Sequence, residues 1–484
     1  MKSNLPIKCN YVIKYNYKIK YSYTIKYSYS LKTRFNSHFQ LNQLVSSPLK
    51  LQSGQILPLS IVGLTLIALL TLNLFNRTQT HNEKIKSANI ADAAAFSGVT
   101  FQARALNYTA YTNRAMIANQ VSIGQLVSMS SWIEYGSDFG TRIGSVLSFI
   151  PYINVLGRIL VQASQQLKKA VNIVPPIISG ITIANQALNA SQRAVLLASK
   201  VDSPLIINKV IQSYDSNYQL STLGKTWLVA NTAQWGLFTD YQNSSSALQE
   251  KAQLINQSRD QWSSSRNINI APPSANTGLA EFKIFYEKSG EARLSYINNS
   301  WRWSSKDAGS VFFEIDPLIG STKTIQLAPM GESHHVLTQS RNSRNQNIPA
   351  RSYNSSNQWF SRRQLNRNTY FRTRNIQAHY TGVQGYNELR TDAEGNKKTS
   401  LTTNIEIEQI NSQDNLNTAM AADTPSQVKA VSQARVFFQR PTQRQDGTIE
   451  YANLFNPYWV GRLSNPNAIR ATSWIQSGVG ALSQ

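Results

Sequence analysis

The chain has 484 residues, a charged fraction of only 15% and a formal net charge of +23. It contains one cysteine, Cys9, which excludes an internal disulfide framework and a multi-thiolate metal site. The positive charge favours acidic partners such as nucleic acid, anionic lipid or lipopolysaccharide, without choosing among them.

The first 53 residues form a basic, low-complexity leader. The hexapeptides KYNYKI, KYSYTI and KYSYSL follow one another within residues 14–31. Alternation of tyrosine with polar residues is strand-like, but the leader has no apolar face to bury. We expect a disordered tail; the alternative is that its Lys and Tyr side chains contact anionic lipid headgroups or nucleic acid.

An uncharged apolar segment follows at residues 56–75 (ILPLSIVGLTLIALLTLNLF). As a helix it would be about 30 Å long, which matches the hydrocarbon core of a bilayer. Its few polar residues are scattered and do not form the polar stripe of a surface helix. We therefore predict a transmembrane helix. Its representative residues are Ile56, Leu57, Pro58, Leu66, Leu70 and Phe75.

Flanking charge predicts the orientation of this segment. Nine basic residues and no acidic residue precede Ile56, whereas the basic residues soon after Phe75 are accompanied by acidic ones. The positive-inside rule then places the N-terminus in the cytoplasm and the residues after the segment across the membrane. A cleaved signal peptide would need a short leader and a small-residue cleavage site, so we expect an uncleaved single-pass anchor.

Residues 76–135 contain no proline and only two glycines, and they are rich in Ala, Leu, Met and Gln. This composition predicts one long helix or two stacked helices. Alanines recur at steps of three and four, which gives a narrow face that allows close helix packing. The residues expected in that packing are Ala91, Ala94, Ala95 and Gly98.

Residues 143–183 are apolar again, but prolines and basic residues interrupt them. This pattern predicts a buried or interfacial helical hairpin; the alternative is a second span, which would return the C-terminal part to the cytoplasm. Helical patterns continue through residues 184–200 and 205–256, with a turn predicted at 202–204.

The sequence NINIAPPSAN at residues 267–276 predicts a linker. Beyond it, alternating and aromatic-rich runs predict strands. These runs are residues 281–286, 292–303, 310–315, 401–410 and 434–438. The second half is therefore predicted to be a mixed α/β or β-rich domain, which gives the whole chain an α+β fold class.

Residues 340–375 carry eight arginines with interleaved aromatic residues and no acidic residue. Arginine with aromatics suits single-stranded nucleic acid, through phosphate pairing and base stacking. The abundance of Asn and Ser favours a long solvated loop instead. The candidate contacts to an acidic polymer are Arg341, Arg344, Arg362, Arg363, Arg367, Arg372 and Arg374.

No constellation in the sequence predicts an enzyme. None of the five histidines has metal-ligand spacing, and no nucleophile elbow, Walker loop or dinucleotide-binding motif occurs. Glu314 and Asp316 would share one face of a strand, but such a pair is usually solvated and not catalytic. We expect no catalytic residue, cofactor, metal or small-molecule substrate.

Several segments together carry a family resemblance. They are Gly54-Gln55-x-x-Pro58, ADAAAFSG at residues 91–98, ARALNYTAYTNRAMIANQ at 103–120, ARVFFQRP at 434–441 and ANLFNPYWVGRLS at 452–464. This set resembles the bacterial Tad/Flp pilus-assembly proteins of the TadE/TadG-like group. The resemblance implies an inner-membrane protein with a cytoplasmic N-terminus and a large periplasmic part. Prepilin-like members have Glu five residues after the glycine, where this chain has Leu59. An unprocessed assembly component is thus expected, not a pilin.

The expected organisation has five parts. They are a leader at 1–53, the membrane segment with a Tad-like N-terminal module at 54–98, a helical exported region at 99–266, a linker at 267–276 and an exported mixed α/β or β-rich domain at 277–484. The expected function is a non-enzymatic, membrane-anchored component of Tad/Flp-type (tight adherence) pilus assembly, with other assembly proteins as partners. The alternative is an envelope protein whose basic exported domain captures an acidic polymer, DNA or lipopolysaccharide.

Overall fold

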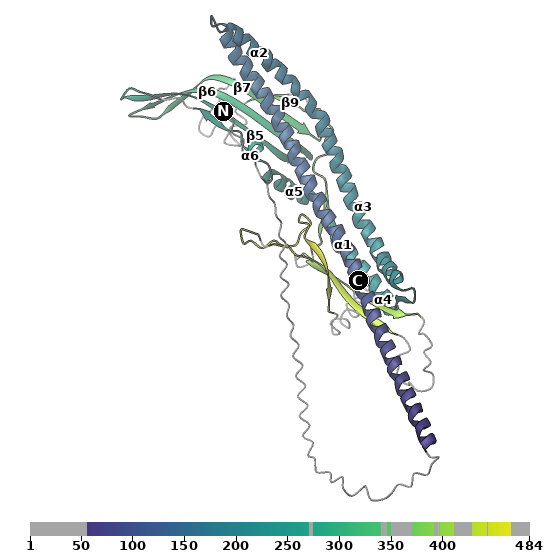
Figure 1. The fold of residues 1–484 in the computed structure, drawn as a ribbon. Helices are drawn as coiled ribbons and strands as arrows, with labels where there is room; N and C mark the ends of the chain where they lie inside the picture. The colour runs from purple at the N-terminus through teal and green to yellow at the C-terminus, as the bar shows by residue number, and fades with distance from the viewer. Residues whose placement is uncertain are drawn as a thin grey trace, which may run out of the picture. The chain divides into compact units, whose positions relative to one another are not determined.

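The computed structural model describes residues 56–270, 274–339, 346–349, 370–391, 395, 397–410, 428–442 and 444–465. It comprises two compact units, Met1–Leu72 and Asn73–Gln484. Helix α1 (Ile56–Ser148) begins in the first unit and continues into the second (Figure 1). The predicted long helix is thus confirmed as one helix, in keeping with the absence of proline between Pro58 and Ser148.

The helical hairpin predicted at residues 143–183 is present, but its turn is exposed and not buried. α2 (Asn154–Lys169) follows α1, and a 3-10 turn, η2 (Ala170–Ile173), leads into α3 (Val174–Tyr214), which packs along α1 (Figure 1). Among the described helices, only α1 is long and apolar enough to cross a membrane. The turn predicted at 202–204 is wrong: Pro204 lies inside α3, where the neighbouring Ser203 and Ile207 are buried against α1.

A four-stranded antiparallel sheet has the order β1-β11-β12-β13. Its strands are β1 (Tyr218–Leu220), β11 (Ser400–Gln409), β12 (Lys429–Phe438) and β13 (Trp459–Ser464). α4 (Thr222–Gly236) packs on β11 so closely that a Cβ on Gly224 would lie 2.0 Å from the Glu406 carbonyl oxygen. β2 (Thr239–Gln242) pairs with β10 (Tyr386–Leu389) in a separate ribbon.

The larger sheet has the order β3-β5-β6-β7-β9-β8, and β4 also pairs with β5. Its strands are β3 (Ile268–Ile270), β4 (Ala275–Asn276), β5 (Ala280–Ile297), β6 (Ser300–Pro317), β7 (Lys323–Thr338), β8 (Gln346–Pro349) and β9 (Tyr370–Asn375). The single strand predicted at residues 292–303 is instead the end of β5, a two-residue turn and the start of β6. Asn298 and Asn299 both have positive φ, as a tight hairpin turn requires.

Two hydrophobic cores share α1. The first contains α1 residues between Ile90 and Leu106, together with α3, α4 and the four-stranded sheet. The second contains α1 residues between Ile117 and Val127, together with α3, α5 (Ser245–Gln257) and the larger sheet. Helices and strands of the second unit therefore pack together. The segment predicted as a linker, residues 267–276, is not a free connection, because its strands β3 and β4 are paired with β5.

Candidate functional site

The apolar segment is exposed along its whole described length. Leu57, Leu66, Leu70 and Phe75 are each more than half exposed, and Pro58 is exposed as well. Its hydroxyl groups are satisfied inside the helix, as in the bond from Thr65 Oγ1 to Ile61 O (2.7 Å). A helix with bare apolar surface on every side and internally satisfied polar groups is suited to hydrocarbon surroundings.

The predicted packing residues lie in a contact within the chain. Ala91, Ala94 and Ala95 are 0% exposed and belong to the first core. Gly98 faces α3, where an added Cβ would lie 2.8 Å from Ile207 Cδ1. This narrow face of α1 is therefore occupied by the protein's own α3 and sheet.

The two groups of segments that carried the family resemblance contact each other. Asn107 of α1 donates to the Trp459 carbonyl of β13 and accepts from the Trp459 amide, both at 2.9 Å. Asn113 donates to the carbonyl of Leu454 at 2.7 Å. Nearer the apolar segment, Ser432 of β12 donates to Asp92 at 2.6 Å. The part of α1 after the apolar segment and the C-terminal strands are thus joined by specific polar contacts.

Gln192 of α3 connects these regions. It is fully buried, and its Nε2 donates to Thr112 Oγ1 (2.9 Å) and Asn113 Oδ1 (2.7 Å) of α1. Its Oε1 accepts from the Asn387 amide (3.1 Å) and side chain (2.8 Å) on β10. A satisfied buried network of this kind fixes the relative positions of the elements it joins.

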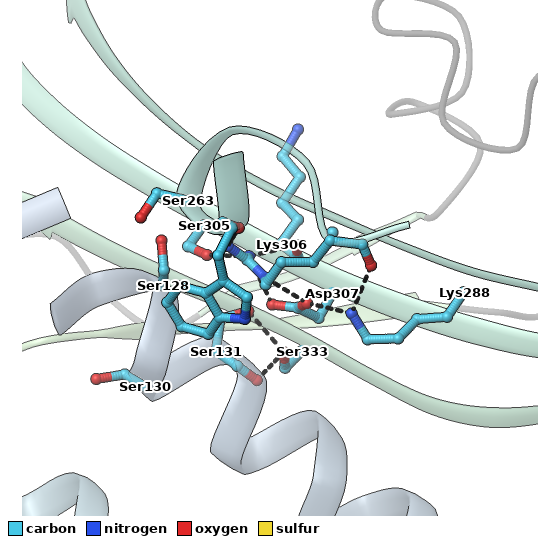
Figure 2. A network of polar contacts seen from close by, with 12 residues as sticks. Ser128, Ser130, Ser131, Ser263, Lys288, Ser305, Lys306, Asp307 and Ser333 are labelled. Atoms are coloured by element: carbon cyan, nitrogen blue, oxygen red, sulfur yellow. Dashed lines mark hydrogen bonds and ion pairs between the residues drawn. The ribbon is translucent and has the colours of Figure 1, made fainter. Parts of the chain in front are cut away.

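A buried charged cluster, called here the Asp307 cluster, lies where the larger sheet meets α1 and α6 (Gln261–Ser264) (Figure 2). Asp307 of β6 is bound bidentately by Arg266, from Nε and Nη2 at 2.9 Å each, and by Lys288 Nζ at 2.8 Å. The side chains of both cations are 2% exposed. Arg266 Nη2 also donates to Ser305 Oγ at 2.9 Å. One buried carboxylate therefore compensates two buried cations.

A glycine and an aromatic ring also contact the Asp307 cluster. A Cβ on Gly290 would lie 2.2 Å from Asp307 Oδ1, so only glycine leaves room for the carboxylate there. Lys288 Nζ lies 5.0 Å from the ring centroid of Tyr135 on α1, a cation–π distance. Burial lowers the pKa of Lys288, although Asp307 opposes that shift.

A second buried acid, Glu134 of α1, binds groups from three elements. His335 Nε2 of β7 lies 3.2 Å from it, Arg374 Nε of β9 lies 2.5 Å from it, and Lys168 Nζ of α2 lies 3.4 Å from it. Burial raises the pKa of Glu134, and Arg374 and Lys168 oppose the shift. Burial lowers the pKa of His335 to about 3, so its imidazole is neutral at physiological pH.

The Ser131–Ser333 contact lies beside the Asp307 cluster, since Ser333 is the register partner of Asp307 (Figure 2). The two hydroxyl oxygens are 2.8 Å apart, and Ser333 also donates to the Ser131 carbonyl at 2.6 Å.

The charged side chains of the Asp307 cluster and of the Glu134 centre contact other protein groups. A groove of about 590 Å³ between α1 and α5 is lined by other residues. These centres are built to hold α1 against the sheet.

Lys251 of α5 supplies a pH-dependent prediction. It is 2% exposed, donates to the Gln384 carbonyl at 2.9 Å, and burial lowers its pKa to about 7. Between pH 7 and 10.5 the unfolded chain binds the proton that the folded chain has released, so the native contribution of Lys251 to stability rises with pH. The free energy of unfolding of Lys251→Met, relative to that of the native chain, should therefore be higher at pH 6 than at pH 10.

Denaturant unfolding of both proteins at the two pH values measures this difference. Lys225→Met, at an exposed lysine of α4, is the matched control and should show no such pH dependence. Equal effects of Lys251→Met at pH 6 and pH 10 would show that the lysine keeps its proton on folding.

The arginine-rich stretch is described only in part. Arg341, Arg344, Arg362, Arg363 and Arg367 lie outside the described residues, and Arg372 is placed only by its backbone in β9. Arg374 is the predicted contact whose side chain is described, and it is paired with Glu134. The proposal that this stretch binds an acidic polymer stays a prediction.

The other titratable candidates occupy ordinary positions. His334 is buried between Ser304 Oγ and Thr373 Oγ1, each 2.8 Å from a ring nitrogen. Glu314 and Asp316 lie on β6, where Asp316 accepts from Thr322 Oγ1 at 2.8 Å. No group of three or more potential metal ligands occurs in the part of the chain that the structure describes.

Sequence reasoning missed Asp307, Arg266, Lys288 and Glu134. One signal was present: residues 304–310 (SSKDAGS) interrupt a strand with a run that lacks large apolar residues on either face. Searches of protein-family models, curated proteins and solved structures found no match for this chain.

Proposed function

We propose that this protein is a non-enzymatic, single-pass membrane component of a Tad/Flp-type pilus-assembly system. The membrane anchor is supported by the apolar part of α1, whose side chains are exposed on all sides. The following turns of the same helix are buried in two cores. A fully exposed helix of this composition is stable in a bilayer and is an aggregation hazard in water.

The proposed placement is the bacterial inner membrane, with the N-terminus in the cytoplasm and the unit that begins at Asn73 in the periplasm. The nine basic residues before Ile56, without any acidic residue, support this orientation. The assembly role rests on the resemblance of residues 91–120 and 434–464. The contacts of Asn107 with Trp459 and of Asn113 with Leu454 join these segments, so they act as one structural element.

The alanine face of α1 is used inside the protein. Partner proteins must therefore contact other surfaces, because Ala91, Ala94 and Ala95 have no exposed area left to offer. The proposed role is that of a rigid scaffold held at the membrane, with other pilus-assembly proteins bound to its exposed faces. Co-purification with those proteins is the expected result.

A charge placed in the apolar segment should release the protein from the membrane. Each arginine at the centre of a transmembrane helix costs about 2.5–3.5 kcal/mol on insertion scales. We expect Leu66→Arg with Leu70→Arg to abolish stable integration, measured as loss of the chain from the carbonate-resistant membrane fraction. Leu279→Arg, at a residue 78% exposed in the second unit, is the control and should leave integration unchanged.

Topology is tested with the same full chain. A periplasm-active reporter fused after Gln484, and another inserted after Ile319, which is 91% exposed between β6 and β7, should both be active and accessible to protease in spheroplasts. An inactive reporter at both positions would contradict the proposed orientation. Integration that survives the double arginine substitution would contradict the anchor itself.

A further inference from the structure

The turn between α1 and α2 carries a cluster of exposed apolar side chains, called here the apolar tip. Phe149 is 89% exposed and Tyr152 is 101% exposed. The other members, all more than half exposed, are Val146, Val155, Leu156 and Ile159. The tip lies at the end of the helix pair, past the strands of the larger sheet (Figure 1). A contiguous exposed apolar surface marks a binding surface, whereas single exposed residues do not.

Near the tip, α1 and α2 contact each other through glycines. A Cβ on Gly144 would lie 2.7 Å from the Gly157 carbonyl oxygen, and a Cβ on Gly157 would lie 2.5 Å from the Ser148 nitrogen. One turn further from the tip, a Cβ on Gly140 would lie 2.2 Å from Ser164 Oγ. Small residues fill much of this contact, together with Val161, and the larger side chains of Leu156 and Ile159 point outward. Helix pairs in lipid are arranged in this way, whereas a helix pair in water normally buries its large side chains.

Few charges lie close to the tip. Residues 139–201 contain no acidic residue. Of the basic residues on the last turns of α1 and on α2, Arg142 is paired with Glu332 (3.7 Å) and Lys168 with Glu134 and Asp138 (3.4 Å each). Arg158 is exposed on α2, about 6 Å along the helical rise from Asn154, where the helix begins. A basic side chain at this height can extend toward headgroups while its stem covers apolar surface.

We propose that the apolar tip inserts into the surface of an anionic phospholipid bilayer, as a lipid contact separate from the apolar segment at residues 56–75. The apolar side chains extend over the last turn of α1 and the first two turns of α2, which suits insertion to a depth of about 5–10 Å. Beyond them α2 exposes Gln162, Gln165 and Gln166, so the tip enters the interface and does not cross the membrane. The exposed Arg158 favours anionic headgroups.

The experiment uses the full chain in neutral phosphatidylcholine nanodiscs. Because Cys9 is the only cysteine, Cys9→Ser with Phe149→Cys gives one labelling site for an environment-sensitive fluorophore. Added vesicles of phosphatidylglycerol and phosphatidylcholine carry a lipid-linked quencher. We expect a blue shift and quenching at position 149. The matched control is a label at Ile449→Cys, where the native side chain is 78% exposed, and it should show neither effect.

Substitutions test the two parts of the surface. Val155→Ser and Leu156→Ser should each weaken vesicle binding about tenfold, because each removes a large apolar side chain from the buried area. Arg158→Glu should weaken it about fivefold or more, and only for anionic vesicles. The proposal is overturned if the label at position 149 is unaffected by vesicles. It is also overturned if the label is already shifted without vesicles and a quencher in the nanodisc lipid does not quench it, which would place the tip against protein.

Discussion

Asp307→Asn is expected to lower the free energy of unfolding by about 3–5 kcal/mol, because removing one partner of a buried ion pair leaves uncompensated buried charge. The substitution keeps the shape of the side chain but removes the single negative charge shared by Arg266 and Lys288. Both cations are 2% exposed, so water cannot replace the lost carboxylate. Denaturant unfolding of the full chain in nanodiscs, followed by tryptophan fluorescence, measures the effect.

Asp446→Asn is the matched control. Asp446 also forms a bidentate pair with an arginine, Arg444, but both side chains are close to half exposed. We expect no measurable change in stability there, since solvent screens the pair. In the second variant, Asp307→Asn with Lys288→Met, part of the lost stability should return because one unpaired cation is gone. A double variant less stable than the single one would show that lost hydrogen bonds, and not unpaired charge, cause the effect.

Gly224→Ala is expected to destabilise the second unit by about 3 kcal/mol, at the upper end of the range for overpacked sites. The added methyl carbon would lie 2.0 Å from the carbonyl oxygen of Glu406 and 3.0 Å from its carbonyl carbon. A strand backbone cannot rotate away as a side chain can, so α4 and β11 must separate. The same denaturant titration measures the loss.

Gly236→Ala, in the same helix, separates packing from helix propensity. Nothing lies within 4 Å of a Cβ at Gly236, so this change should leave stability unchanged or slightly improved. A similar cost for both substitutions would mean that glycine is needed for backbone freedom and not for contact with β11.

The elements that were predictable from sequence are those with a strong local signal. The long helix follows from a proline-free, alanine-rich run, and β11 and β12 follow from alternating residues such as those between Leu401 and Gln409. Local signals failed where tertiary packing overrode them. Pro204 does not end α3, because buried residues on either side of it hold the helix against α1.

The charged clusters could not be predicted, because their members come from separate elements. Arg266 and Asp307 are 41 positions apart in the chain, and Glu134 meets His335 only through the packing of α1 on the sheet. Each residue taken alone resembles an ordinary surface charge. Only the fold brings them together and removes water from them.

The contact between Asn107 and Trp459 has a consequence for the order of events in synthesis. The two residues are 352 positions apart, which corresponds to about 20–70 s of translation at about 5–20 residues per second. During that interval α3 is already made, but the C-terminal strands that complete the cover of the alanine face are missing, and Asn107 lacks its partner. Folding of the second unit is therefore completed only after the C-terminal strands have been made. A chain that stops before Trp459 will leave its earliest-made helix without its latest-made partner.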